Sequence, residues 1–272
     1  MKNQYLLKAE NISSGYDDKV IVKNLSLSIP PNKISVIIGA NACGKSTLLK
    51  TLSRLIRPMK GKVLLNGTEL SKIAPKKLAG NLGLLPKSPV VPEGITVFDL
   101  VVRGRYPYQS FLRGLSKKDY EAVEEALEIM GITDLADRNV EELSGGQRQR
   151  VWIAMALAQE TDILLLDEPT TFLDISYQVE ILDLLTDLNR KRGTTIVMVL
   201  HDINLSARYA DHIIAMRSGS IIAEGNPDEI ITSSLVRTVF DLDCEVIRDP
   251  ISHSPVIIPI GRHHVSFPRK VV

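Results

Sequence analysis

One eight-residue motif constrains the fold of this chain more than any other feature of its sequence. It runs from Gly39 to Ser46 and matches the pattern G-x-x-x-x-G-K-[ST]. A short β-branched run, 34–38, precedes it and leucines at helical spacing follow it, so the sequence predicts a strand, a glycine-rich loop and a helix. Backbone N–H groups in such a loop point at phosphates, Lys45 supplies a positive charge, and Ser46 offers a hydroxyl to Mg²⁺.

The motif therefore predicts that the loop binds the phosphates of a nucleotide such as ATP, together with Mg²⁺. The alternative interpretation is a glycine turn that only caps a helix. The residues assigned to nucleotide binding in this segment are Gly39, Ala40, Asn41, Ala42, Cys43, Gly44, Lys45, Ser46 and Thr47.

A second motif supplies two carboxylates at the end of a predicted strand. The apolar run 163–166 is followed directly by Asp167 and Glu168. Ligands of open parallel sheets bind beyond the carboxyl ends of the strands. We predict that Asp167 and Ser46 hold Mg²⁺ and that Glu168 polarises a water for attack on the γ-phosphate. Taken alone, a strand that ends in Asp-Glu is more often a solvated turn, and the phosphate loop favours the functional interpretation.

The rest of the chain divides into three patterns. Residues 6–29 alternate between apolar and polar around a turn at 15–18, which predicts antiparallel strands. The middle third predicts a mainly helical insertion, in which Ser116 and Asp119 form a helix-capping pair. After about residue 160 strand and helix patterns alternate again, so we expect a parallel sheet there. The 272 residues fit one large domain or two small ones.

A third motif carries a resemblance to a known family. The run Leu143-Ser144-Gly145-Gly146-Gln147 stands between the phosphate loop and the Asp-Glu strand, and it resembles the signature of the ATP-binding-cassette (ABC) ATPases. The resemblance implies an α/β fold, a P-loop NTPase of the ABC ATPase type. Its parts are an N-terminal antiparallel β part, a RecA-like parallel-sheet core and a helical insertion. The expected boundaries are 1–262 for a single domain, about 88–160 for the insertion, about 225–262 for a C-terminal extension and 263–272 for a flexible tail.

The signature also has a physical interpretation. Ser144 is a good N-cap residue, and glycine amides at a helix N-terminus can receive phosphate oxygens. The alternative is a flexible loop that only caps the following helix. In the family the signature completes the ATP site of the opposite subunit, which implies an ATP-dependent head-to-tail homodimer. The resemblance thus adds Ser144, Gly145, Gly146 and Gln147 to the nucleotide-binding residues.

Three further positions match family residues one at a time. Tyr16 resembles the aromatic residue that stacks on adenine, although a lone turn tyrosine is more often a packing residue. His201 resembles the switch histidine that contacts the γ-phosphate and aligns the water, so His201 and Glu168 are the expected catalytic residues. Asp174 resembles the loop residue that touches the partner subunit, with capping of the next helix as the alternative.

Three residues depart from the family pattern. Ala40 and Ala42 replace the usual Pro and Gly, and binding should survive if Ala42 is right-handed, since alanine tolerates positive φ poorly. Lys87 stands where the family normally has a glutamine whose oxygen reaches Mg²⁺. Because lysine has no acceptor oxygen, either water replaces that ligand or the coupling of hydrolysis to the insertion is altered. We expect Lys87→Gln to lower the Mg²⁺ concentration that half-maximal ATPase activity requires.

The family also implies what the ATPase powers. One cassette without a fused membrane segment suggests an importer whose permease is a separate chain and whose solute-binding protein is an indirect partner. The aromatic and arginine residues of 98–111 form either a core patch or a groove for a permease helix. Four stretches resemble the ferric-siderophore importer subgroup, namely 92–97, 103–107, 170–174 and 249–259. Importers for vitamin B12, haem or another metal chelate are the alternative.

Composition limits the location and the partners. Lys plus Arg is 33 and Asp plus Glu is 32, so a net charge of +1 gives no general attraction for nucleic acid. The longest apolar runs fall short of the roughly 18 residues of a transmembrane helix, and no secretory signal is readable. We expect a cytoplasmic protein, held on the inner face of the cell membrane by integral-membrane permease subunits. Cys43 and Cys244 are expected to be reduced thiols.

A different class of function is a soluble ABC ATPase that acts on DNA or ribosomes. DNA-repair members of the family place very long coiled coils between the phosphate loop and the signature. Here only positions 46–143, 98 residues, separate Lys45 from Ser144. Ribosome-acting members usually carry two cassettes in one chain, and this chain has one. Both observations oppose this class.

Overall fold

Three sheets organise the chain in the computed structural model, which describes residues 5–263 except 88, 90, 110–113 and 172. The N-terminal sheet contains β1 (Leu7–Tyr16), β2 (Lys19–Ser28), β4 (Lys60–Leu65) and β5 (Thr68–Glu69) in the order β2-β1-β4-β5. All its pairs are antiparallel, and Tyr16 lies opposite Lys19 where β1 turns into β2. The predicted antiparallel N-terminal part is confirmed.

The central sheet is the scaffold of the site. It contains β3 (Ile34–Gly39), β6 (Leu82–Leu85), β7 (Ile163–Asp167), β8 (Thr195–Val199), β9 (His212–Arg217) and β10 (Ser220–Gly225) in the order β10-β9-β3-β8-β7-β6. Its pairs are parallel except β10 with β9. Since β3 and β7 both pair with β8 in parallel, their carboxyl ends lie at one edge of the sheet. That edge brings the phosphate loop and the Asp-Glu pair together.

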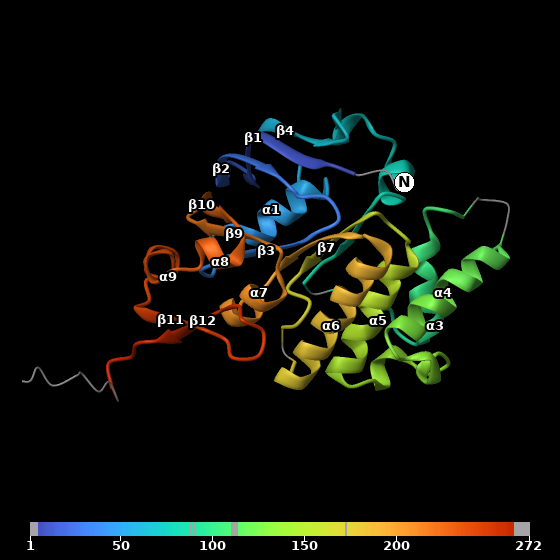
Figure 1. Cartoon of the computed structure of the whole chain (residues 1–272). Coiled ribbons are helices and arrows are strands. Elements are labelled where there is room, and N and C mark those ends of the chain that lie inside the picture. Colours follow the sequence, from blue (N-terminus) through green and yellow to red (C-terminus); the bar gives the residue numbers. More distant parts are fainter. Residues whose placement is uncertain (1–4, 88, 90, 110–113, 172, 264–272) are drawn as a thin grey trace, which may run out of the picture.

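Helices cover both faces of this sheet. The helices among the described residues are α1 (Lys45–Leu52), α2 (Pro75–Ala79), α3 (Val97–Val102), α4 (Lys117–Ile129), α5 (Gly145–Ala158), α6 (Ile175–Arg192), α7 (Ile203–Tyr209), α8 (Pro227–Ile230) and α9 (Ser233–Phe240). Successive strand side chains point to opposite faces. Ile37 therefore packs with Leu48 of α1 and Leu7 of the N-terminal sheet, whereas Val36 and Ile38 pack with residues of α5, α6 and α7. Figure 1 shows α1 between the N-terminal sheet and the central sheet.

The helical insertion lies on the other side of the molecule from α9, where α3, α4 and α5 gather (Figure 1). Ser116 and Asp119 form a reciprocal capping box at the start of α4, as predicted. Helix α4 ends at Ile129, and Gly131 follows with φ 61°. A short 3₁₀ turn, Arg103–Arg105, connects α3 to the exposed Tyr106.

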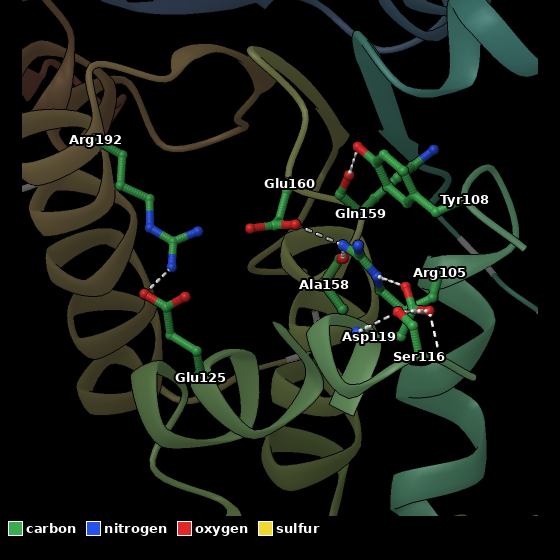
Figure 2. Close-up of polar contacts among 9 residues, drawn as sticks. All are labelled: Arg105, Tyr108, Ser116, Asp119, Glu125, Ala158, Gln159, Glu160 and Arg192. Carbon is green, nitrogen blue, oxygen red and sulfur yellow. Dashed lines mark hydrogen bonds and ion pairs between the residues drawn. The ribbon is translucent and has the colours of Figure 1, made fainter. Parts of the chain in front are cut away.

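A buried arginine, Arg105, forms hydrogen bonds that connect the helical insertion to the segment before β7 (Figure 2). The Arg105 side chain is 1% exposed, and its Nε donates to Oδ1 of Asp119 at 2.9 Å. Its Nη1 donates to the carbonyl of Ala158 at 2.6 Å and to Oε2 of Glu160 at 2.8 Å. The guanidinium also lies 4.1 Å from the ring centroid of Tyr108. Arg105 therefore links the start of α4 to the chain that leads into β7.

Arg105→Met should lower the free energy of unfolding by about 2 kcal/mol, because it leaves buried acceptors without their donor while keeping most of the side-chain volume. Urea denaturation measures the change. Arg248→Met is the matched control, because Arg248 makes an exposed ion pair with Asp228 and should change stability by no more than about 0.5 kcal/mol. Equal effects of the two substitutions would contradict the structural role of Arg105.

The C-terminal part packs against α7. It contains α8, α9 and a hairpin of β11 (Cys244–Arg248) and β12 (Pro255–Pro259). Asn204 of α7 exchanges two hydrogen bonds with the backbone of Ile257, which fixes the hairpin in place. Cys43 and Cys244 are buried free thiols, as predicted. Apart from His263, the predicted flexible tail lies outside the described residues.

Candidate nucleotide-binding site

The glycine-rich loop has the predicted position between β3 and α1. Gly44 is the N-cap of α1 with φ 107°, a conformation that side chains rarely adopt. At Gly39, a Cβ atom would lie 2.3 Å from the carbonyl oxygen of Met216, so only glycine fits there. Nζ of Lys45 donates to the carbonyls of Gly39 and Ala40 at 2.8 and 2.9 Å, which folds the loop around the lysine.

Ala42 lies in the left-handed region with φ 61°, so the right-handed conformation considered from the sequence is not the one it adopts. The loop requires a left-handed residue where the family usually has glycine. An L-residue in this region carries about 1–2 kcal/mol of strain. The loop nevertheless closes, and Ala42 lines the same cavity as its neighbours.

Ala42→Gly should raise the free energy of unfolding by about 0.5–1 kcal/mol, since it removes this strain against a smaller loss of chain entropy. Urea denaturation measures the gain. Ala40→Gly is the matched control, because Ala40 has no positive φ and should only lose stability. A loss of stability in both variants would contradict the strain at Ala42.

The carboxyl edge of the central sheet contains a cavity of about 790 Å³. It brings most of the phosphate loop together with both predicted catalytic residues. The lining residues are Lys19, Ile21, Asn41, Ala42, Cys43, Gly44, Lys45, Ser46, Thr47, Lys87, Glu168, Thr171 and His201. Lys19, Ile21 and Thr171 were not predicted from the sequence.

The two predicted metal ligands contact each other. The Ser46 hydroxyl donates to Oδ1 of Asp167 at 2.9 Å. Burial raises the pKa of the Asp167 carboxyl more than the Ser46 hydrogen bond lowers it. A hydroxyl and a carboxylate fit Mg²⁺, which prefers oxygen ligands and keeps several waters. Within the described part of the chain, no group of three or more His, Cys, Asp and Glu could hold a metal ion.

Glu168 is held through both carboxylate oxygens. Nε2 of His201 lies 2.7 Å from Oε1, while Nζ of Lys87 and the hydroxyl of Thr171 lie 2.6 and 3.0 Å from Oε2. Burial raises the pKa of the Glu168 carboxyl, but the bonds from Lys87, His201 and Thr171 outweigh it and lower the pKa overall. Glu168 also has φ 56°, a strained conformation of the kind that occurs at functional sites.

The ion pair between Lys87 and Glu168 was not predicted. The sequence analysis considered Lys87 only in relation to the metal and the phosphates. Strands β6 and β7 pair in parallel with Leu85 opposite Leu166, and each charged residue follows its leucine by two positions. The strand register therefore places Lys87 beside Glu168.

Tyr16 and the signature lie outside the cavity lining. Tyr16 is 45% exposed at the end of β1, and its hydroxyl lies 3.5 Å from Nζ of Lys50 on α1. Ser144 and Gln147 form a capping box at the start of α5, which confirms the predicted cap. Ser144 and Gly145 are exposed, whereas Gly146 is buried against the ring of Tyr177.

Asp174 occupies the N-cap position of α6, but its side chain makes no capping hydrogen bond. The helix-capping alternative therefore does not explain the side chain. The neighbouring residue 172, part of a stretch used for the family resemblance, lies outside the described residues, as does Phe111 of the aromatic stretch.

The loop, the buried carboxylates and the parallel sheet together define a P-loop nucleoside triphosphatase. Comparison with known proteins narrows the class. The family described as ABC transporter matches residues 22–171, and the chain belongs to this family. As an ABC ATP-binding subunit, it hydrolyses ATP to drive transport.

Two relatives align over nearly the whole chain. One is the "Probable siderophore transport system ATP-binding protein YusV" of Bacillus subtilis (strain 168), which is 55% identical over 94% of this chain and 93% of its own length. The other is the "Ferric enterobactin transport ATP-binding protein FepC" of Escherichia coli (strain K12), which is 50% identical over 94% of each chain.

Solved structures confirm the fold. The structure described as "An inward-facing conformation of a putative metal-chelate type ABC transporter" superposes with a TM-score of 0.82 at 29% identity, over 95% of this chain and 98% of that one. A dimeric post-hydrolysis state of the ATP-binding cassette MJ0796, bound to ADP and Pi, superposes with a TM-score of 0.71 at 28% identity, over 81% of this chain and 98% of that one. The predicted ABC ATPase fold is confirmed.

Proposed function

We propose that this chain is the ATP-hydrolysing subunit of an importer for ferric siderophores. The cavity supports the ATPase part, because it joins the phosphate loop to Glu168 and His201. The siderophore part is supported by the relatives of 50% and 55% identity, which carry siderophore transport names. Vitamin B12, haem and other metal chelates are the alternative cargoes.

The residues of the site have different roles in ATP binding and hydrolysis. Backbone N–H groups of Asn41–Thr47 and the charge of Lys45 bind the phosphates of ATP, and Tyr16 stacks on adenine. Ser46 and Asp167 hold Mg²⁺, which neutralises charge that develops on the phosphates. Glu168 accepts a proton from the attacking water, and His201 holds the Glu168 carboxylate in place through Oε1.

The exposed signature supports a homodimer. Ser144 and Gly145 present a capped helix N-terminus to solvent at a distance from the lining of the chain's own cavity. In a head-to-tail pair each signature, Ser144–Gln147, meets the ATP of the partner. The similarity to a dimeric cassette bound to ADP and Pi supports this arrangement.

Integral-membrane permease subunits are the proposed second partner, with a solute-binding protein acting indirectly. Among the described residues, no helix is both long and apolar enough to cross a membrane. The side chains of Tyr106 and Tyr108 are exposed beside the buried Arg105, and exposed aromatics favour an interface. We propose that residues 1–262 form one ATPase domain, that this surface docks the permease, and that the complex lies on the cytoplasmic face of the membrane.

Affinity purification from solubilised membranes tests the assembly. The tagged chain should recover a polytopic permease, and the double variant Tyr106→Ala, Tyr108→Ala should recover less of it while its ATP binding is unchanged. Lys117→Ala is a matched control, because Lys117 is exposed on α4 and should not change recovery. Recovery of ribosomes or DNA in place of a permease would contradict the proposal and favour a non-transport ATPase.

A further inference from the structure

Lys87 and Glu168 form the closest polar contact of the proposed catalytic carboxylate. Their Nζ and Oε2 atoms are 2.6 Å apart, and the Glu168 side chain is only 5% exposed. The Lys87 side chain is 43% exposed, so it reaches the carboxylate from the rim of the cavity. Both residues of the pair therefore line the cavity in which we propose that the nucleotide binds.

The contact reduces the number of acceptor positions that Glu168 can offer to a water. A carboxylate offers about four acceptor positions, two on each oxygen. Lys87 and Thr171 fill those of Oε2, and His201 takes one of Oε1. One acceptor position is then left for a water, and the ammonium charge offsets the negative charge that attracts the water's proton.

Lys87 is not needed to orient Glu168. The bonds from His201 and Thr171 already hold one oxygen each, and burial restricts the side chain. Removal of Lys87 would leave this support intact and free one acceptor position on Oε2. Removal of Lys87 should therefore raise the rate of ATP hydrolysis, because the gain from a freed acceptor on Glu168 outweighs the loss of one contact that positions its carboxylate.

We propose that Lys87 is a restraining residue that occupies the catalytic carboxylate and limits ATP hydrolysis by this subunit. The proposal rests on the assignment of Glu168 as the base.

ATPase assays of three variants separate this role from metal ligation. Lys87→Met and Lys87→Gln both remove the cation, and each should raise the turnover of the purified chain about three- to tenfold. Lys87→Arg keeps a cation and should show a smaller rise than either. Lys191→Met removes the lysine of an exposed Lys191–Asp187 pair outside the cavity lining and should leave turnover unchanged.

The pair itself is measured without catalysis. Acetic anhydride modifies free amines, and mass spectrometry compares the acetylation rate of Lys87 with that of the exposed Lys191 in the nucleotide-free protein. The rate at Lys87 should rise severalfold in Glu168→Gln, because the charged partner is lost. The rate at Lys191 should not change.

Each result decides a different point. Turnover of Lys87→Met at or below that of the unmodified chain would overturn the restraint, and so would a rise confined to Lys87→Gln, which would show that the glutamine oxygen acts on the metal. Equal acetylation rates of Lys87 in the unmodified chain and in Glu168→Gln would contradict the ion pair between Lys87 and Glu168. Full activity of Glu168→Gln would instead remove the assigned base, and it would do so whatever the Lys87 variants show.

Discussion

Glu168→Gln should reduce ATP hydrolysis about 1,000-fold and leave ATP binding intact, because the amide keeps the shape of the side chain but is not a base. The two oxygens of Glu168 face His201 and Thr171 in the cavity, so the isosteric amide retains a place in the same network. Phosphate release measures the turnover, and equilibrium dialysis measures the affinity for ATP. The variant should also dimerise when ATP is added, as light scattering would show.

Glu121→Gln is the matched control for this substitution. Glu121 is an exposed glutamate of α4 that pairs with Lys117, and its replacement should leave turnover within twofold of the unmodified chain. Turnover of Glu168→Gln close to that of the control would place the base elsewhere in the cavity.

Lys45→Ala should weaken ATP binding about 100-fold, because it deletes the buried charge that we assign to the nucleotide phosphates. Lys45 is 5% exposed and donates to the carbonyls of Gly39 and Ala40, so its ammonium has a fixed position within the loop. Binding should therefore fail before chemistry does, and isothermal titration calorimetry measures the loss.

Two controls separate this effect from unfolding. Thermal unfolding should show that Lys45→Ala remains folded, and Lys33→Ala, which removes an exposed partner of Asp211, should bind ATP normally. An unchanged affinity of Lys45→Ala would exclude the lysine from phosphate binding.

The sequence predicted the parts of the fold whose signals are local. The β-branched run 34–38 and the apolar run 163–166 became β3 and β7, and the capping residues Ser116 and Ser144 begin α4 and α5. Each signal depends only on the spacing of side chains within one strand or one helix. The backbone geometry of that element fixes this spacing, so it can be recognised in the sequence. The phosphate loop and the Asp-Glu pair followed, since parallel strands align their carboxyl ends.

Contacts set by the packing of distant segments were not predicted. The Lys87–Glu168 pair depends on the register of β6 against β7, and a shift of this register would separate the two residues. Arg105 was assigned to an aromatic patch, but it is a buried link because α4 and the end of α5 supply its partners. The left-handed conformation of Ala42 follows from closure of the loop, and the alanine itself gives no signal for it.

Uptake of a radioiron-labelled ferric siderophore tests the central claim most directly. Cells that lack this chain are supplied with the unmodified protein, with Glu168→Gln or with the control Glu121→Gln, at equal expression, and the cell-associated iron is counted. We predict that the unmodified chain and the control restore uptake and that Glu168→Gln does not. Equal uptake with and without the unmodified chain, for the siderophores that these cells accumulate, would contradict the claim that this ATPase powers ferric-siderophore import.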